Sequence, residues 1–278
     1  MAIRKRKLVA SPHCFRRRLS DPIVSCVRLI ARLDIKGPAL IKSIQLEGVR
    51  KIGDPNAFAT RYYEQGIDEL IYMDVVASLY ERSKLIDLVE RTAEKIFVPI
   101  TVGGGIRSVE DARELLRAGA DKIAINTAAI NNPVMITDIA RVLGNQCVVL
   151  SIEAKSTGSE RWEAYCDGGR EHTGRDVVEW AKEGQRLGAG EILLTSVDRE
   201  GTQRGLDMDL LREVTSAVDI PVIASGGVGK ADHLIDAAQQ TDTAAFAMAH
   251  VLHYDKYTVG DLRNALNAAH IPVRRVVA

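Results

Sequence analysis

Short apolar runs alternate with amphipathic stretches of helical length from residue 28 onward. Eight runs have the length of a strand: Leu29–Leu33, Leu70–Met73, Ile100–Val102, Lys122–Ile125, Cys147–Ile152, Ile192–Thr195, Val222–Ala224 and Ala244–Ala247. Strands that alternate with helices form parallel sheets, and eight such units can close into a barrel. The pattern predicts an α/β protein with the (β/α)8 TIM barrel fold.

Residues typical of helix N-termini stand between these runs. Pro55 suits the first turn of the first helix. Ser108 with Asp111, and Thr258 with Asp261, have the spacing at which a side chain caps the helix that follows. These positions predict the starts of the first, third and eighth helices.

An internal repeat supports this count of units. The segment Gly66–Leu70 is similar to Gly188–Ile192, and Pro99–Gly105 is similar to Pro221–Gly227. Both pairs have the same offset of 122 residues. Two matches at one spacing predict two half-barrels of four units each, related by a pseudo-twofold axis.

Composition agrees with one large domain and sets the N-terminus apart. The 278 residues are 46% hydrophobic and 27% charged, with 37 basic and 37 acidic side chains, so no net charge favours nucleic acid or an anionic membrane. Residues 1–26 form a basic extension that we expect to be disordered; a transit peptide and a nucleic-acid arm are alternatives. Its basic residues are Arg4, Lys5, Arg6, Lys7, Arg16, Arg17 and Arg18. We expect residues 27–278 to form a single catalytic barrel.

The cysteines and the apolar runs bear on location. Cys14, Cys26, Cys147 and Cys166 are few and form no CxxC pair, which favours reduced thiols in a cytoplasmic protein and gives no sign of a metal site. No apolar run approaches the roughly 20 residues of a membrane helix. We therefore expect a protein that binds neither membrane nor metal.

Glycine-rich segments follow two strands that should lie half a barrel apart. We call Gly103–Gly105 the first cradle and Ser225–Gly227 the second cradle. Glycines such as Gly104, Gly105, Gly226 and Gly227 let backbone N–H groups approach an anion ahead of the next helix. One glycine pair alone would suit an ordinary turn, but the symmetric pairs predict two phosphate sites. Neighbouring residues could complete them: Asn126, Thr127 and His250, with helix capping an equal alternative for the first two.

Two acids terminate strands that face each other across the predicted barrel. Asp34 ends the first strand and Glu153 ends the fifth. The C-terminal ends of the strands carry the active site in such barrels, and opposed, desolvated carboxylates can act as general acid and general base. We interpret Asp34 and Glu153 as catalytic. Asp74, Asp198 and Glu200 could orient a ligand, although loop capping and salt bridges explain them equally well.

Charged residues stand just before four strands, at the opposite mouth of the barrel. They are Arg28, Glu69, Lys122 and Glu191. They could converge on the barrel axis, or they could be solvated at the strand entrances, where ion pairs contribute little. The pattern alone leaves both interpretations open.

These motifs together resemble one family, the ammonia-using cyclase subunit of imidazole glycerol phosphate synthase of histidine biosynthesis. The resemblance covers nearly all of the chain after residue 27. It rests on Leu33-Asp34 with Lys42, Gly53-Asp54-Pro55, Asp68-Glu69-Leu70 with Asp74 and Ala77-Ser78, Val102–Ile106, Gly119–Lys122 with Ile125-Asn126, and Thr195–Thr202.

The resemblance implies roles for several residues. Asp34 and Glu153 would be the catalytic acid and base, Lys42 would lie on a mobile loop that closes over the substrate, and Glu200 with Gly201 would belong to the motif after strand six. The four charged residues before the strands would form a gate that admits ammonia from a separate glutaminase subunit, in a heterodimer. Ammonia would attack a linear aminoimidazole-carboxamide ribonucleotide with a phosphate at each end, giving imidazole glycerol phosphate and the carboxamide ribotide without a cofactor.

The sequence also departs from this family at the site. Glu153 and Glu200 stand where aspartates are usual, Arg32 replaces a residue that is commonly cysteine, and Met248-Ala249-His250 replaces a run of small residues. A displaced acid can lose a large factor in rate. Three alternatives follow: a paralogue that delivers ammonia to another acceptor, as in amidination of a bacterial surface sugar; a phosphoribosyl aminoaldose isomerase barrel; and a non-catalytic barrel that only docks a glutaminase.

Overall fold

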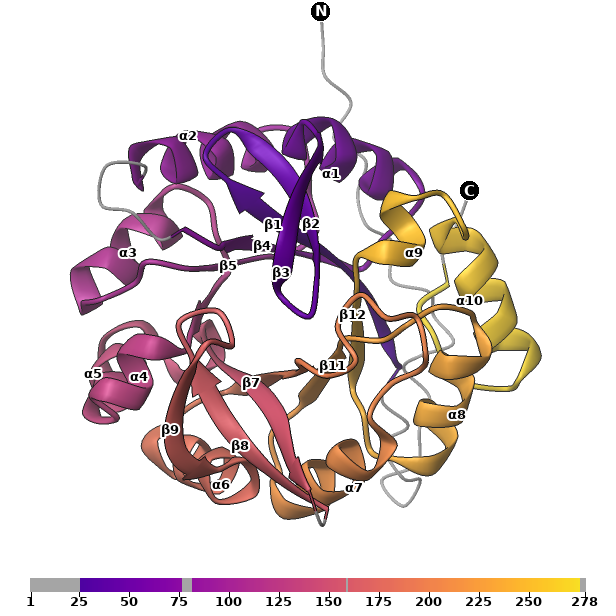
Figure 1. The fold of residues 1–278 in the computed structure, drawn as a ribbon. Coiled ribbons are helices and arrows are strands. Elements are labelled where there is room, and N and C mark those ends of the chain that lie inside the picture. The colour runs from indigo at the N-terminus through magenta and orange to yellow at the C-terminus, as the bar shows by residue number, and fades with distance from the viewer. Residues whose placement is uncertain (1–25, 77–81, 159, 276–278) are drawn as a thin grey trace, which may run out of the picture.

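Eight parallel strands close into a barrel in the computed structural model, which describes residues 26–76, 82–158 and 160–275. The closing pairs join β7 to β10 and β12 to β1, and helices surround the ring (Figure 1). The barrel strands are β1 (Arg28–Lys36), β4 (Glu69–Asp74), β5 (Ile100–Gly103), β6 (Lys122–Ile125), β7 (Val148–Gly158), β10 (Glu191–Ser196), β11 (Val222–Ser225) and β12 (Ala245–Met248). The predicted barrel and all eight strands are confirmed.

The outer layer consists of helices that follow the strands. They are α1 (Pro55–Glu64), α2 (Arg82–Ala93), α3 (Val109–Arg117), α4 (Thr127–Asn131), α5 (Val134–Leu143), α6 (Val177–Leu187), α7 (Met208–Ala217), α8 (Asp232–Gln240), α9 (His250–His253) and α10 (Val259–Ala268), with a short 3-10 turn at Asn145–Cys147. Pro55 opens α1, Ser108 caps α3, and Thr258 with Asp261 forms a capping box on α10. All three predicted helix starts are confirmed.

Two antiparallel hairpins at the C-terminal mouth were not predicted. The first consists of β2 (Ala39–Ile44) and β3 (Glu47–Gly53), and the second of β8 (Arg161–Cys166) and β9 (Glu171–Asp176), which pair with an extended β7. The β2–β3 hairpin reaches over the barrel in Figure 1. The expectation that only helices separate the strands is therefore wrong at these two places.

The pseudo-twofold repeat is visible in the strand register. Asp34 lies opposite Met73 in the β1–β4 pair, and Glu153 lies opposite Thr195 in the β7–β10 pair. Residues 73 and 195 differ by the offset of 122 found in the sequence. The two half-barrels therefore superpose strand on strand, with β7 in the place of β1.

Side chains that point into the barrel form an apolar layer across its middle. They are Ile30, Ile71, Ala124, Val149, Leu193, Ile223, Ala245 and Ala247, all buried. A larger apolar cluster fills the space between the strands and the helices. Each buried aliphatic side chain contributes roughly 1.5–3 kcal/mol to stability, so the barrel is a rigid support for residues at the strand ends.

The predicted basic extension, residues 1–26, lies outside the described residues except for Cys26. Within the described part of the chain, no helix is long and apolar enough to cross a membrane.

Candidate active site

The two carboxylates predicted to be catalytic lie at the C-terminal mouth on opposite strands. Asp34 belongs to β1 and Glu153 to β7, which are four strands apart in the ring of eight. Both are buried, with exposed fractions of 2% and 9%. The cradles follow β5 and β11, which are also four strands apart. A ligand that joins the two cradles therefore crosses the line between the carboxylates.

Asp34 is held in a buried ion pair with Arg32, two residues earlier on the same strand. Nε of Arg32 lies 2.9 Å from Oδ1 of Asp34. Burial opposes the charge of Arg32, but the Asp34 and Glu200 carboxylates outweigh it and raise the pKa of the guanidinium. Arg32 is therefore a permanent cation beside Asp34.

Glu153 has a different environment. Burial raises the pKa of Glu153 to about 7, against the opposing effects of the Arg32 charge and of a hydrogen bond from Gly169 N–H. That hydrogen bond, from the turn between β8 and β9 to Oε2, is 2.7 Å long. At neutral pH a large fraction of Glu153 keeps its proton, so the two carboxyl groups differ in charge.

The two cradles have the same backbone geometry. Gly104 and Gly226 adopt φ angles of +99° and +96°. A Cβ atom would lie 2.2 Å from the carbonyl oxygen of Asp74 at Gly104, and 2.7 Å from that of Ser196 at Gly226. Glycine is required at both positions because of the left-handed conformation and the close approach. Both glycines and both neighbouring carbonyls differ by 122 residues, so the repeat preserves this contact.

The backbone N–H groups of the cradle glycines are not used within the protein. Among the described residues, none accepts a hydrogen bond from the N–H groups of Gly104, Gly105, Gly226 or Gly227. Unpaired donors on adjacent glycines are suited to an oxyanion.

Asn126 and Thr127 lie beside the first cradle and hold the β8–β9 hairpin. Asn126 Nδ2 donates to the carbonyl oxygen of Tyr165 at 3.1 Å, and Thr127 Oγ1 accepts from Asp167 N–H at 3.1 Å. Asn126 makes no side-chain cap on α4, so the capping interpretation is wrong for this residue. Its buried Oδ1 has no partner among the described residues and can accept a hydrogen bond from a ligand.

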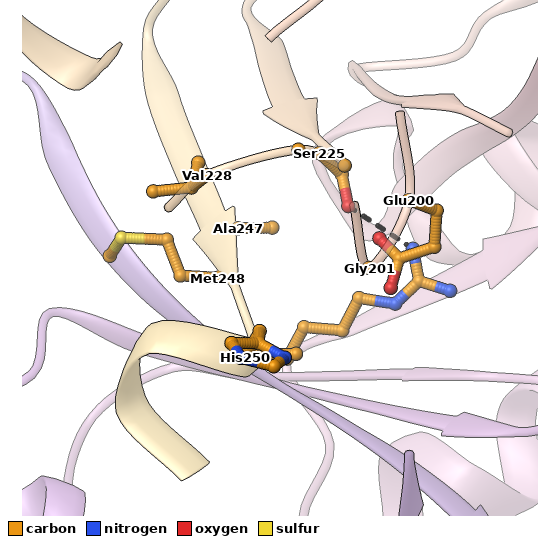
Figure 2. A pocket seen from close by; sticks show the side chains of 11 residues that line it. Glu200, Gly201, Ser225, Val228, Ala247, Met248 and His250 are labelled. Carbon is orange, nitrogen blue, oxygen red and sulfur yellow. Dashed lines mark hydrogen bonds between the residues drawn. The ribbon is translucent and has the colours of Figure 1, made fainter. Parts of the chain in front are cut away.

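A pocket of about 300 Å³ that is open to solvent lies at the second cradle (Figure 2). Ser225, Gly226 and Gly227 line it together with Arg32 and His250. Burial lowers the pKa of His250, as do the charges of Lys256 and Lys42. His250 is therefore a neutral hydrogen-bonding group at the pocket wall.

The β2–β3 hairpin is fastened to the loop after β10. Lys42 on β2 forms a buried ion pair with Glu200, and Gln45 N–H donates to the Glu200 carbonyl oxygen at 2.9 Å. Gly201 lies under the hairpin, where a Cβ atom would be 2.9 Å from Ile44 Cα. The longer side chain of Glu200 therefore reaches the lysine of the hairpin.

The four charged residues at the opposite mouth form a closed ring on the axis, which we call the gate ring. Arg28 contacts Glu69 at 2.6 Å and Glu191 at 2.5 Å, and Lys122 contacts the same acids at 3.2 and 2.7 Å. Their strands project these side chains inward, two positions before the apolar layer. The solvated alternative is wrong: the residues converge, and both glutamates are buried.

Sequence reasoning missed Gly169, which contacts Glu153, and the contact of Arg32 with Thr195 and Ser225. The Asp167–Gly169 segment carries a turn signal that could have revealed the β8–β9 hairpin. No local signal marks the partners of Arg32, because they lie on distant strands.

Comparisons with known proteins agree with this geometry. The family model described as "Histidine biosynthesis protein" matches residues 28–258. Three relatives carry the name "Imidazole glycerol phosphate synthase subunit HisF". That of Legionella pneumophila is 66% identical over 207 residues, 74% of this chain and 98% of the relative. Those of Thermococcus onnurineus and Bacillus cereus are 51% and 45% identical over 247 residues, 89% of this chain and 97% and 98% of the relatives.

Proposed function

The chain belongs to the histidine biosynthesis protein family, and we propose that it acts as a HisF-type, ammonia-using cyclase subunit of imidazole glycerol phosphate synthase. The observation that carries the proposal is the crossing of two axes at one barrel mouth, the Asp34–Glu153 axis and the axis between the glycine cradles. A linear aminoimidazole-carboxamide ribonucleotide with a phosphate at each end fits this cross. Its phosphates bind the cradles and its reacting centre lies between the carboxylates.

Asp34 and Glu153 divide the proton transfers. Ammonia forms the new C–N bond, and the reaction releases imidazole glycerol phosphate, the carboxamide ribotide and water. Asp34, in its ion pair with Arg32, accepts a proton from the attacking nitrogen. Glu153, whose pKa is about 7, donates a proton to the leaving group. Two carboxyl groups in unlike environments can thus take unlike roles.

The β2–β3 hairpin closes the site. Lys42 and Glu200 hold the hairpin on the loop after β10. The hairpin therefore excludes water from the reacting centre and places the Lys42 ammonium near the substrate, as in the mobile loop of this family.

Ammonia enters at the gate ring from a glutaminase subunit bound at the opposite mouth. The relatives are named as subunits, which supports a complex with a second chain. The apolar layer between the gate ring and the carboxylates favours neutral ammonia over ammonium. The free thiols of Cys147 and Cys166 agree with a cytoplasmic heterodimer.

A second candidate is the paralogue that passes ammonia to another acceptor, such as a bacterial surface sugar. The observation that favours it is the altered wall of the second pocket, where Arg32, Glu200 and His250 lie together. Its reaction keeps the carboxylates and the gate ring and changes only the acceptor.

Purified protein supplied with the linear ribonucleotide and an ammonium salt at alkaline pH tests the proposal. The cyclase function predicts release of both products in equal amounts, dependent on ammonia. Isomerisation of the aminoaldose phosphate without ammonia would instead identify an isomerase. If the ribonucleotide binds and is not consumed, the cyclase assignment fails and the paralogue becomes the better description.

A further inference from the structure

Arg32 breaks the twofold symmetry of the barrel. In the strand register, Arg32 lies opposite Ile71 and Ser151 lies opposite Leu193, and residues 71 and 193 differ by 122. Ser151 is therefore the counterpart of Arg32 in the other half. A guanidinium occupies one side of the barrel where a small neutral hydroxyl occupies the other.

The Arg32 side chain extends toward the second cradle. Its Nη1 donates to Thr195 Oγ1 at 2.9 Å on β10 and to Ser225 Oγ at 3.2 Å on β11. Between β1 and β11 lies β12, whose inward residue at this level is the small Ala247. The small side chain leaves room for the arginine to cross β12. The cation is thus fixed under the second cradle, far from the first.

Two donors of this guanidinium remain unused. Arginine has five N–H groups, and Arg32 uses its Nε for Asp34 and its Nη1 for Thr195 and Ser225. Within the described chain, Nη2 has no hydrogen-bond acceptor. Arg32 is only 5% exposed, yet it lines the pocket at the second cradle. A buried cation with free donors facing a pocket requires an anionic partner.

We propose that Arg32 is a specificity-determining residue that binds a phosphate of the substrate in the second cradle and thereby fixes which end of a two-phosphate substrate binds there. The proposal rests on the proposed function and deepens it. The Gly226 and Gly227 N–H groups contact the phosphate from one side and Nη2 from below. The first cradle binds with backbone and neutral side chains only. A substrate with unlike ends therefore has a preferred orientation in a barrel whose backbone is nearly symmetric.

Amide chemical shifts of the cradle glycines, measured during titration with inorganic phosphate at constant ionic strength, test the proposal. Gly226 and Gly227 should titrate at lower phosphate concentration than Gly104 and Gly105. Arg32→Met should raise the phosphate Kd at the second cradle about tenfold or more, as expected for loss of a charged hydrogen bond, and leave the first unchanged. Ser151→Ala, the matched change in the other half, should alter neither Kd. Equal affinity of the cradles in the unmutated protein, or an unchanged second-cradle Kd in Arg32→Met, would overturn it.

The pairing of Arg32 with Asp34 requires a second comparison, because Arg32→Met also exposes the Asp34 charge to the ligand. Asp34→Asn and the double variant Asp34→Asn/Arg32→Met lack that charge. If Arg32 contacts phosphate, the double variant binds phosphate about tenfold or more weakly than Asp34→Asn. Equal affinities mean that Arg32 only neutralises Asp34, and the proposal fails.

Arg32→Lys covers the case in which Arg32→Met does not fold. Lysine keeps the charge and loses the planar fork, so its second-cradle Kd should lie above that of the unmutated protein, with the first cradle unaffected. An identical Kd contradicts the proposal. These titrations need neither ammonia nor turnover, so asymmetric phosphate binding without cyclase activity refutes the proposed function alone. Cyclase activity with equivalent cradles refutes the role of Arg32 alone.

Discussion

The backbone N–H of Gly169 donates a hydrogen bond of 2.7 Å to Oε2 of Glu153. The donor belongs to the turn between β8 and β9, and the acceptor to the end of β7. An aspartate at this position would be one methylene too short to make the same contact. The hairpin and the longer acid therefore form one unit that fixes the position of the carboxyl group.

Shortening this acid should lower activity, although it restores the residue usual in the family. In Glu153→Asp the carboxyl group retreats from Gly169 by about 1 Å, and such a displacement can cost on the order of 100-fold in rate. We expect that loss in kcat with ammonium salt and little change in KM. The measurement is steady-state turnover of the linear ribonucleotide. A variant as active as the unmutated protein would show that the contact with Gly169 does not position the acid.

Glu153 should also make stability depend on pH. Its pKa in the folded protein is about 7, above the ordinary value of 4.5, so the unfolded chain releases this proton first as pH rises. The protonated acid therefore costs no stability below about pH 4.5, and the fold loses about 3 kcal/mol between pH 4.5 and 7. Glu153→Gln cannot ionise and should escape this loss.

The Tm difference between Glu153→Gln and the unmutated protein, measured from pH 4.5 to 7.5, checks this prediction. The difference should shift in favour of the variant up to about pH 7 and stay constant above it. A pH-independent difference would mean that Glu153 titrates at its ordinary pKa.

The ion pair between Lys42 and Glu200 should hold the β2–β3 hairpin closed. Removing one partner leaves an unpaired buried charge, which costs about 3–5 kcal/mol where the site cannot relax. In Glu200→Gln we expect the hairpin to open more often, so that proteases cleave it faster while the barrel stays intact. Mass spectrometry of the fragments locates the cut. Arg113→Gln, which removes an exposed ion pair with Glu110, is the control and should leave the cleavage rate unchanged. Equal cleavage in Glu200→Gln and the unmutated protein would exclude a fastening role.

The gate ring should affect ammonia only when it arrives from the partner subunit. Lys122 contacts both Glu69 and Glu191, so Lys122→Met leaves two buried carboxylates with one cation. We expect turnover with glutamine and the glutaminase subunit to fall several-fold, whereas turnover with ammonium salt stays close to that of the unmutated protein. Equal losses with both nitrogen sources would place the defect outside the ammonia path.

The barrel could be predicted because each strand is a short apolar run and because the glycine segments repeat at one spacing. The hairpins could not. Strand β3 is largely exposed and has no apolar face, and the β2–β3 turn places Gln45 and Leu46 at φ angles of 52° and 64° without glycine. Tertiary contacts with the loop after β10 decide that conformation, and they are absent from the local sequence.

The candidate site divides in the same way. Asp34, Glu153 and the cradles follow from their positions at strand ends, which the fold brings together. The contacts of Arg32 do not, since Thr195 and Ser225 lie 163 and 193 residues away. A substitution beside a catalytic acid is visible in the sequence, but the direction of its side chain is set by the barrel.

Ammonium-dependent turnover of the linear ribonucleotide by the unmutated protein and by Asp34→Asn tests the central claim most directly. The account predicts that the unmutated protein forms imidazole glycerol phosphate and the carboxamide ribotide in equal amounts. It also predicts that Asp34→Asn binds the ribonucleotide but turns it over about 100-fold to 10,000-fold more slowly, the range expected for loss of a general base. Undiminished turnover by Asp34→Asn, or binding without turnover by the unmutated protein, would contradict it.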